Sequence, residues 1–282
     1  MADDITITST RNPRVVAARK LTQRKHRARQ GRFLVQGQQL LWMALDAGYM
    51  IEEVFTSSCT APEQDDTREL LHRMHKNGTQ LIQVSSEILK SLTSRDDMQT
   101  LVGTVKQKLL SLHEIILPKI ALVLILDRLQ DCGNTGTLIR TADAAGASVV
   151  ILLEPCADVT DPRAVRSSMG SLFNLPVVSV PDISELRAWL KAHKLPLIAA
   201  DAHQGTLWGN HNLHGPAALC LGNEARGLSA DLAALVDSRV RLPMLGKADS
   251  LNVAVAGGIL MYLWVKVNHA PQPVYEIKSG VR

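Results

Sequence analysis

The feature that most constrains the fold is a nearly uninterrupted apolar run, Ile120–Leu126, which follows Pro118. A strand without polar alternation has both faces covered, as in a parallel sheet. The run ends at Asp127 and is followed by a turn through Gly133-Asn134 and a helical pattern over Thr137–Ala145. This order of strand, turn and helix is the unit from which parallel sheets are built.

The same alternation continues along the second half of the chain. Further strands are predicted at Ser148–Leu153, Pro196–Ala200, Ala217–Leu221 and Val240–Leu242. Helices are predicted at Pro162–Met169, Ile183–His193, Ser229–Leu235 and Val253–Val265. We therefore expect an α/β domain with a parallel sheet over residues 120–282.

The first half of the chain predicts a smaller mixed α/β domain over residues 1–107, followed by a linker at 108–119. Its predicted helices are Arg14–Arg29, Gln38–Ala47, Glu63–Lys76 and Ser86–Leu92. Its predicted strands are Arg32–Gln36, Ile51–Thr56, Gln80–Val84 and Leu101–Lys106.

Composition limits the class of protein. The chain has 282 residues, of which 46% are hydrophobic and 21% charged, enough for two globular cores. The four cysteines are scattered without metal-ligand spacing, so we expect reduced thiols and no metal. The N-terminus lacks a secretory pattern, and the apolar run Val253–Val265 is too short to span a bilayer. We expect a cytoplasmic protein without a membrane partner.

Charge is distributed unevenly. Between Ile5 and Leu45 there are nine Lys or Arg residues and no Asp or Glu. With Asp3 and Asp4 counted, residues 1–45 have a net charge of +7. The whole chain has a formal net charge of +4, so the remaining residues have a net charge of −3. A basic block on a nearly neutral body indicates a polyanionic partner.

Three segments of the second half carry candidate functional residues. The first, Asp127–Gly146, has a glycine turn at a helix N-terminus, where free amides can hold an anion. The second, Leu219–Ser229, leaves a buried strand at Gly222, beyond the strand end where ligands bind in open α/β sheets. Read separately, each segment also fits an ordinary strand–loop with solvated polar residues.

The third segment, Val240–Leu260, leads through a glycine loop into a very apolar helix. Ser250 is the expected N-cap of this helix. Asn252 needs a polar partner at the start of so apolar a helix. The small residues Ala254, Ala256, Gly257 and Gly258 permit close packing against another element, such as another subunit.

Several common catalytic motifs are absent from the sequence. No GxGxxG follows an early strand, and there is no GxxxxGK[ST], HExxH or GxSxG pattern. Dinucleotide-binding Rossmann sites, P-loops and the corresponding hydrolase sites are therefore not supported.

Taken together, the three segments resemble motifs 1, 2 and 3 of the SpoU (TrmH-like) branch of the SPOUT RNA methyltransferases. They read NTGTLIRTADAAGA, LGNEARGLS and LPMLGKADSLNVAVA, in the family's order and spacing. The resemblance covers roughly Ile120 to Val267 and includes the middle segment DPRAVRSSMGSLFNLPV. It implies a trefoil-knotted α/β domain that dimerises and transfers a methyl group from S-adenosylmethionine to a ribose 2′-hydroxyl without a metal.

The resemblance also implies roles for single residues. Arg140 matches the catalytic arginine, either as a base or as a stabiliser of the developing alkoxide and the neighbouring phosphate. The polar residues that match the family's orienting set are Asn134, Glu224, Ser250 and Asn252. The positions that match its cofactor site are Gly222, Leu242 and Leu251, with Met244 nearby. Cys132 stands where the family usually has Pro.

The N-terminal half resembles the RNA-binding accessory domain of the ribosomal-RNA members, through TSTRNPRV, the basic helix and GRFLVQG, in which Gln36 stands where Glu is common. Phosphate neutralisation supplies most sequence-independent RNA affinity. The expected RNA-binding residues are Arg11, Arg14, Lys20, Arg24, Lys25, Arg27, Arg32 and, in the second half, Arg166. This domain favours ribosomal RNA of the large subunit as the substrate.

Two other functions stay open at this point. One is a tRNA ribose 2′-O-methyltransferase, whose branch commonly lacks the accessory domain. The other is a non-catalytic RNA-binding or ribosome-assembly protein, against which the intact polar set argues. The motifs do not specify the target nucleotide, nor whether the enzyme has a housekeeping or an antibiotic-resistance role, because RNA recognition depends on shape and splayed bases.

Overall fold

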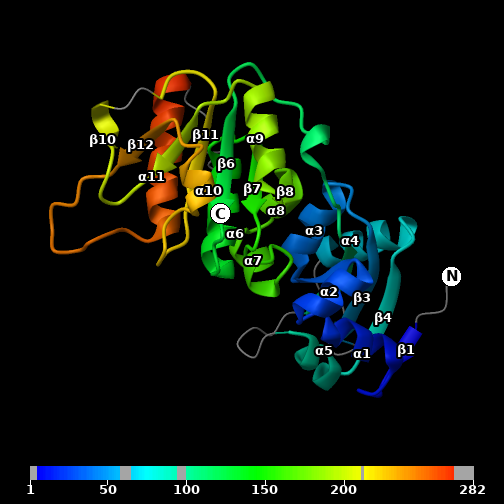
Figure 1. Cartoon of the computed structure of the whole chain (residues 1–282). Helices are drawn as coiled ribbons and strands as arrows, with labels where there is room; N and C mark the ends of the chain where they lie inside the picture. The colour runs from blue at the N-terminus through cyan, green and yellow to red at the C-terminus, as the bar shows by residue number, and fades with distance from the viewer. Residues whose placement is uncertain (1–4, 58–64, 94–99, 211–212, 270–282) are drawn as a thin grey trace, which may run out of the picture. The chain divides into compact units, whose positions relative to one another are not determined.

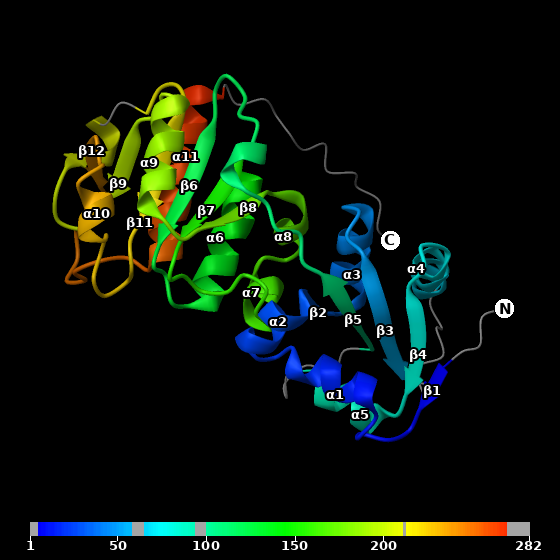
Figure 2. The same cartoon turned by 45° about the vertical axis from the view of Figure 1, so that its right-hand side comes forward.

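The computed structural model describes residues 5–57, 65–93, 100–210 and 213–269. Contacts between residues divide the chain into two compact units. Unit 1 comprises Met1–Ser111, Gln130–Arg140 and Cys156–Val178. Unit 2 comprises Leu112–Leu129, Thr141–Pro155 and Ser179–Arg282. Figures 1 and 2 show the elements of both units.

Unit 1 is built on a five-stranded mixed sheet of order β1-β4-β3-β5-β2. Its strands are β1 (Ile5–Ile7), β2 (Arg32–Gln36), β3 (Ile51–Ser57), β4 (Gln80–Val84) and β5 (Leu101–Lys106). Strands β1, β4 and β3 pair in parallel, whereas β5 pairs antiparallel with both β3 and β2. Every strand predicted in the first half is present, and β1 was not predicted.

Unit 1 also contains helices, most of which contact strands of this sheet. They are α1 (Pro13–Lys20), α2 (Arg24–Gln30), α3 (Gln38–Asp46), α4 (Asp65–Lys76), α5 (Ser86–Leu92), α7 (Pro162–Ser167), α8 (Ser171–Asn174) and the first part of α6 (Cys132–Ala144). The prediction of one basic helix over Arg14–Arg29 is wrong, because the chain turns between α1 and α2 at the buried Leu21. Asn12 caps α1 by accepting from the Arg14 amide at 2.9 Å, and Gly31 ends α2 with φ +62°.

The second sheet has seven strands in the order β10-β12-β9-β11-β6-β7-β8. They are β6 (Leu122–Asp127), β7 (Val149–Leu153), β8 (Val177–Val180), β9 (Leu197–Ala200), β10 (Thr206–Leu207), β11 (Ala217–Leu221) and β12 (Ser238–Arg241). The five pairings from β10 through to β7 are all parallel. All residues of β6, β7 and β11 are buried, as expected for strands covered on both faces.

Three further helices accompany this sheet: α9 (Ile183–Ala192), α10 (Ala230–Ala233) and α11 (Val253–Asn268). Short 3-10 turns lie at η1 (Leu112–Glu114) and η2 (Trp208–Asn210). Helix α11 packs along β9 and β11. The predicted class, a parallel-sheet α/β domain with a smaller N-terminal α/β domain, is confirmed. Among the described residues, no helix is long and apolar enough to cross a membrane.

A buried arginine organises unit 1. Arg27, on α2, is 1% exposed. Its Nε and Nη2 donate to Asp158 Oδ2 at 3.0 and 2.7 Å, and its Nη1 donates to the Leu21 carbonyl at 2.9 Å. Nη2 also lies 3.4 Å from Asp161 Oδ2, and Asp161 caps α7 through the Arg163 amide. This ion pair therefore holds the start of α7 against α2.

We expect Arg27→Met to lower the free energy of unfolding by about 3 kcal/mol at pH 7, because two carboxylates that are mostly buried lose their cation. Burial by itself raises the pKa of Asp158, but hydrogen bonds from Thr160 and Arg27 outweigh burial and lower the pKa. The ion pair's contribution to the free energy of unfolding is thus complete above the ordinary pKa range of aspartate. It is lost as the pH falls through the lowered pKa of Asp158. Denaturant titrations from pH 7 to pH 3 test this.

The matched control is Arg29→Met, at an exposed position on the same helix, for which a change within about 0.5 kcal/mol is expected. Equal effects of the two substitutions would refute the role assigned to Arg27.

Candidate active site

A cavity of about 820 Å³ lies in unit 2, at the carboxyl ends of β9, β11 and β12. These three strands are neighbours in the sheet and run in parallel, so the loops that follow them meet at one edge. The loop after β9 contributes 200–204, the loop after β11 contributes 221–228, and the loop after β12 leads to Ser250 and α11. This is the position at which parallel α/β sheets bind ligands.

Seven of the predicted site residues line this cavity. They are Gly222, Glu224, Leu242, Met244, Ser250, Leu251 and Asn252. Leu242, Met244, Leu251 and Leu260 of α11 supply apolar walls, and Glu224, Ser250 and Asn252 supply polar groups. Such a mixture suits a ligand with both a flat apolar part and charged groups.

Gly222 sets the path of the loop after β11. A Cβ at this position would lie 2.5 Å from the Leu228 amide nitrogen and would also meet the Gly227 backbone, so only glycine fits. The loop closes through reciprocal hydrogen bonds between Asn223 and Gly227, at 3.0 and 2.8 Å. The Asn223 side chain accepts from the amides of Ala225 and Arg226, both at 3.1 Å.

Two links tie this loop to the end of β6. Asn223 Nδ2 donates to the Arg128 carbonyl at 2.9 Å. The fully buried carboxylate of Asp127 accepts from the Ser229 amide and lies 3.2 Å from Arg128 Nε. Arg128 has φ +56°, a conformation that a non-glycine residue adopts only when its surroundings hold it. Asp127 thus fastens the end of β6 to the loop that carries the second motif, a role the sequence analysis missed.

The loop after β9 was also missed. Asp201 Oδ1 accepts from the amides of His203 and Gln204, both at 2.9 Å, and Oδ2 accepts from Arg239 at 2.9 Å. Burial alone raises the pKa of Asp201, but these hydrogen bonds and the Arg239 charge outweigh it and lower the pKa. An aspartate directly after a predicted strand that neighbours the motif strands was the available signal.

The start of α11 corrects one prediction. Asn252, not Ser250, is the N-cap, and its Oδ1 accepts from the amides of Ala254 and Val255 at 2.9 and 3.3 Å. The helix begins at Val253, so Ser250 lies too far upstream to reach its first amides. Ser250 is exposed and lines the cavity.

Asn134 and Arg140 lie on α6, within the part of that helix that belongs to unit 1. Arg140 is exposed, and neither residue is among those that line the cavity in unit 2. The helix begins at Cys132, five residues before the predicted start, and Asp131 caps it by accepting from the Asn134 amide at 2.7 Å. The Asp131 carboxylate therefore already accepts from one of the helix N-terminal amides that the sequence analysis proposed as an anion site.

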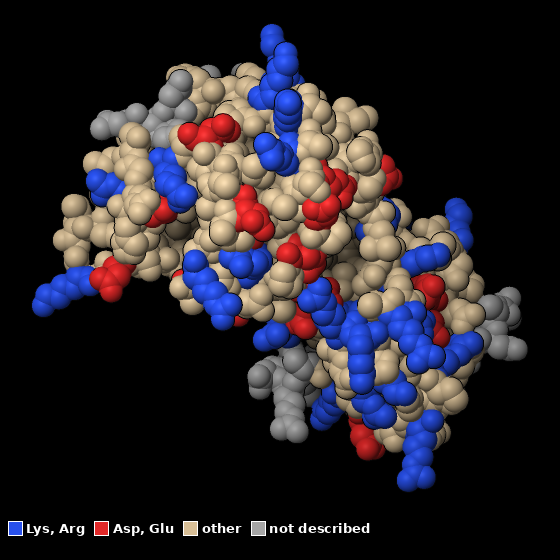
Figure 3. Space-filling model, viewed as in Figure 1, with Lys and Arg blue, Asp and Glu red and all other residues tan. Residues whose placement is uncertain are grey.

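The expected RNA-binding residues of unit 1 differ in exposure. Arg11, Lys20, Arg24 and Lys25 are exposed around α1 and α2, where Lys and Arg gather on the surface (Figure 3). Partial desolvation, followed by the charges of the neighbouring Lys25, Lys20 and Arg29, lowers the pKa of His26.

Four residues of this set also make contacts within the protein. Arg24, although exposed, donates from Nη1 to the Cys156 carbonyl at 3.2 Å. Arg14 donates to Gln80 at 2.6 Å, and Arg32 lies 3.1 and 3.2 Å from Glu52 and Glu53. Arg27 is buried, so its guanidinium is inaccessible to a phosphate and we remove it from the set. Arg166 lies on α7 and is partly buried.

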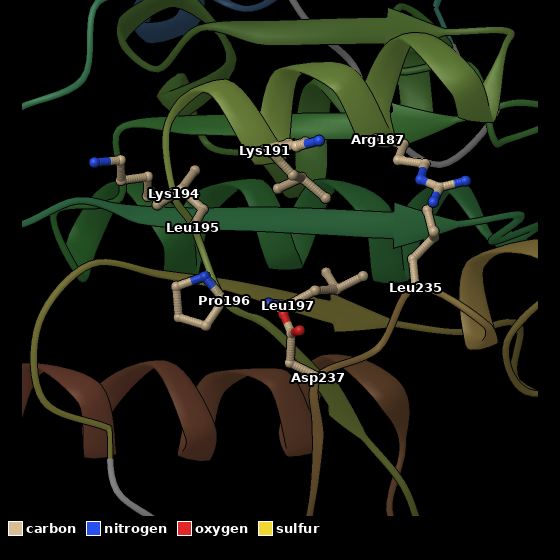
Figure 4. Close-up of a pocket in the computed structure, with 9 residues that line it drawn as sticks. Arg187, Lys191, Lys194, Leu195, Pro196, Leu197, Leu235 and Asp237 are labelled. Carbon is tan, nitrogen blue, oxygen red and sulfur yellow. Dashed lines mark hydrogen bonds between the residues drawn. The ribbon is translucent and has the colours of Figure 1, made fainter.

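A second hollow of unit 2, of about 630 Å³, lies at the opposite ends of the strands (Figure 4). It is lined by residues just before β9 and β12 and by Arg187 and Lys191 of α9. None of the predicted site residues lies there. Among the described residues, no group of three His, Cys, Asp or Glu side chains is arranged to hold a metal ion.

Comparisons with known proteins identify the family. The model of the SpoU rRNA Methylase family matches residues 121–262, and that of the MRM3-like substrate binding domain matches residues 12–103. The AdoMet-bound rRNA methyltransferase from Sinorhizobium meliloti superposes with a TM-score of 0.85 at 32% identity, over 93% of this chain and 97% of that one. The SpoU methyltransferase AviRb from Streptomyces viridochromogenes, in complex with AdoMet, gives 0.83 at 32% identity, over 91% and 98%.

The 23S rRNA (guanosine(2553)-2′-O)-methyltransferase RlmP of Bacillus subtilis is 31% identical over 91% of this chain and 97% of its own. The chain belongs to the SpoU rRNA methylase family. The predicted family and the predicted enzyme class, an RNA ribose 2′-O-methyltransferase, are thereby confirmed.

Gly222→Ala should displace the loop over 223–228, because the added methyl meets backbone that has nowhere to move. We expect about 1–3 kcal/mol of destabilisation and loss of hydrogen-exchange protection at the Asn223 and Gly227 amides. The matched control is Gly209→Ala, where a Cβ meets nothing within 4 Å. Unchanged protection in Gly222→Ala would contradict this account of the loop.

Proposed function

We propose that this protein transfers the methyl group of S-adenosylmethionine to a ribose 2′-hydroxyl of 23S ribosomal RNA. The cavity at the ends of β9, β11 and β12 carries the proposal, because family motifs 2 and 3 both line it. The family match over residues 121–262 and the 23S rRNA relatives support it. The substrate-binding domain matched at residues 12–103 favours ribosomal RNA over the tRNA alternative.

The cavity suits S-adenosylmethionine chemically. Gly222 lines the cavity and allows the close turn of the loop that follows it, and Leu242, Met244 and Leu251 offer apolar walls for an adenine. Glu224 adds a carboxylate, complementary to the positive groups of the cofactor. When bound, the cofactor supplies an electrophilic methyl group on its sulfonium sulfur. Two solved relatives are AdoMet complexes, which supports this assignment.

The chain's own residues orient the nucleophile and stabilise charge. In-line attack by a ribose oxygen is accelerated by alignment and by removal of the hydroxyl proton. We assign to Arg140 the stabilisation of the developing alkoxide and the adjoining phosphate, because guanidinium keeps its proton at neutral pH. Asn134, Glu224, Ser250 and Asn252 are assigned to orienting substrate and arginine. Arg166, Arg11, Arg14, Lys20, Arg24, Lys25 and Arg32 are assigned to RNA.

A homodimer formed by the C-terminal domain is part of the proposal. Val255, Ile259 and Tyr262 are between 38% and 51% exposed and recur at helical spacing along α11, and Leu251, just before the helix, is 38% exposed. An apolar stripe of this kind is unfavourable in water and suits a second copy. We also propose that the domains span residues 1–107 and 120–282 and are joined by a linker at 108–119. The second domain contains a trefoil knot. The protein is located in the cytoplasm.

Arg140→Ala should fold and bind S-adenosylmethionine like the wild type, because Arg140 does not line the cavity, but lose at least about 100-fold in kcat. Single-turnover methylation of a 23S rRNA transcript and calorimetry with the cofactor measure the two properties. Arg187→Ala, an exposed arginine on α9, is the control and should remain active. Full activity in Arg140→Ala would remove this arginine from the mechanism.

Val255→Glu with Ile259→Glu should convert the dimer to a monomer, because each places an unpaired carboxylate in an apolar interface. Sedimentation velocity measures the mass. Leu109→Glu, at a position that is 87% exposed outside the stripe, should leave the assembly unchanged. A monomeric wild type, or a dimeric double variant, would contradict this interface.

A further inference from the structure

Unit 1 contains a small cavity of about 260 Å³ that the function described so far does not use. It lies between the end of β2, the first turn of α3, and α7. Its lining residues are Leu34, Gln36–Leu40, Pro162, Val165, Arg166 and Met169. Its volume falls below the range of about 300–1,000 Å³ typical of sites for whole cofactors, so it suits a smaller planar group.

The walls of this cavity combine features that suit a nucleobase. Leu34 and Val165 are buried apolar residues at the cavity. Met169 is 41% exposed and can place its thioether against a flat ring. Arg166 lies on the same wall and carries the charge that an adjoining phosphate needs.

Two glutamine side chains are oriented by contacts outside the cavity. Gln36 Nε2 donates to the Leu92 carbonyl at 3.2 Å, which leaves Oε1 as the end available to a ligand. Gln38 Oε1 accepts from the Thr67 hydroxyl at 2.8 Å, which leaves the Nε2 donor. Within the described part of the chain, those two remaining ends make no further hydrogen bond. One acceptor and one donor are therefore preset beside the cavity.

The wall formed by Met169 is held in a costly conformation. Met169 has φ +48°, which a non-glycine residue adopts only when its surroundings impose it. The next residue, Gly170, has φ +93°, and its missing side chain leaves the space that Met43 of α3 occupies. The buried Arg27–Asp161 contact fixes the start of α7 from its other end. Packing thus maintains a strained, exposed methionine beside the two glutamines.

We propose that this cavity binds one unpaired base of the RNA substrate, with Gln36 and Gln38 on its hydrogen-bonding edge and Arg166 on the adjoining phosphate. The inference rests on the proposed function, which makes RNA the substrate. Each of the four bases presents a donor beside an acceptor, so the pair selects a splayed base rather than one sequence. The base bound here is separate from the methylated nucleotide, which reacts beside the cofactor.

The test measures binding of a 23S rRNA transcript by the full chain. Gln38→Met removes the donor, and Gln38→Glu keeps an acceptor for Thr67 while presenting a carboxylate to the base. Each should weaken RNA binding by about tenfold or more, because a site built around a polar contact is left unpaired. The controls Gln83→Met and Gln83→Glu make the same changes on β4, outside the cavity, and should stay within twofold.

Methylation and cofactor binding separate this inference from the proposed function. In the Gln38 variants, kcat at saturating RNA and the Kd for S-adenosylmethionine should equal those of the wild type, with KM alone raised. If the wild type methylates the transcript and both Gln38 variants bind it normally, the base site is refuted and the methyltransferase function stands. If the wild type binds the transcript but does not methylate it, the proposed function fails, and the Gln38 variants still decide the base site. A wild type that binds no RNA overturns both.

Discussion

The parallel pairing of β9, β11 and β12 is the constraint on which the active site depends. Because the three strands run in one direction, their carboxyl ends share an edge, and loops separated by up to fifty residues in the chain line one cavity. Buried polar contacts then fix the loops to each other. The carboxylate of Asp127 reaches the Ser229 amide, and the Asn223 side chain reaches the Arg128 carbonyl. These two hydrogen bonds, one of them to the buried Asp127, fix the loop that begins at Gly222.

Much of this arrangement was predictable from local sequence. The apolar run at β6 indicates a strand buried on both faces, and polar residues after β11 and β12 indicate the ligand edge. The helix start at α11 was not predictable from cap preference alone. Serine and asparagine are both good caps, and the position of the first helical residue, Val253, decided for Asn252. The fastening role of Asp127 was hidden because its partner lies 102 residues away.

The basic N-terminal block shows the limit of charge counting. Nine cations in one stretch predict a polyanion site, yet Arg27 lies inside the protein against Asp158 and Asp161. Removing a guanidinium from water is costly, and the two carboxylates that offset the cost lie more than 130 residues away. Sequence separation of that size leaves no local signal. The exposed members, such as Lys20 and Lys25, are accessible to a polyanion.

Arg27 also bears on the geometry of unit 1, because its contact with Asp161 fixes the start of α7, the helix that carries Arg166. RNA recognition depends on where cations and hydrogen-bonding groups are placed. The ion pair from α2 to the cap of α7 positions Arg166 and Met169 relative to Gln36 and Gln38 within one unit. A substrate-binding domain that only supplied positive charge would not need that fixed geometry.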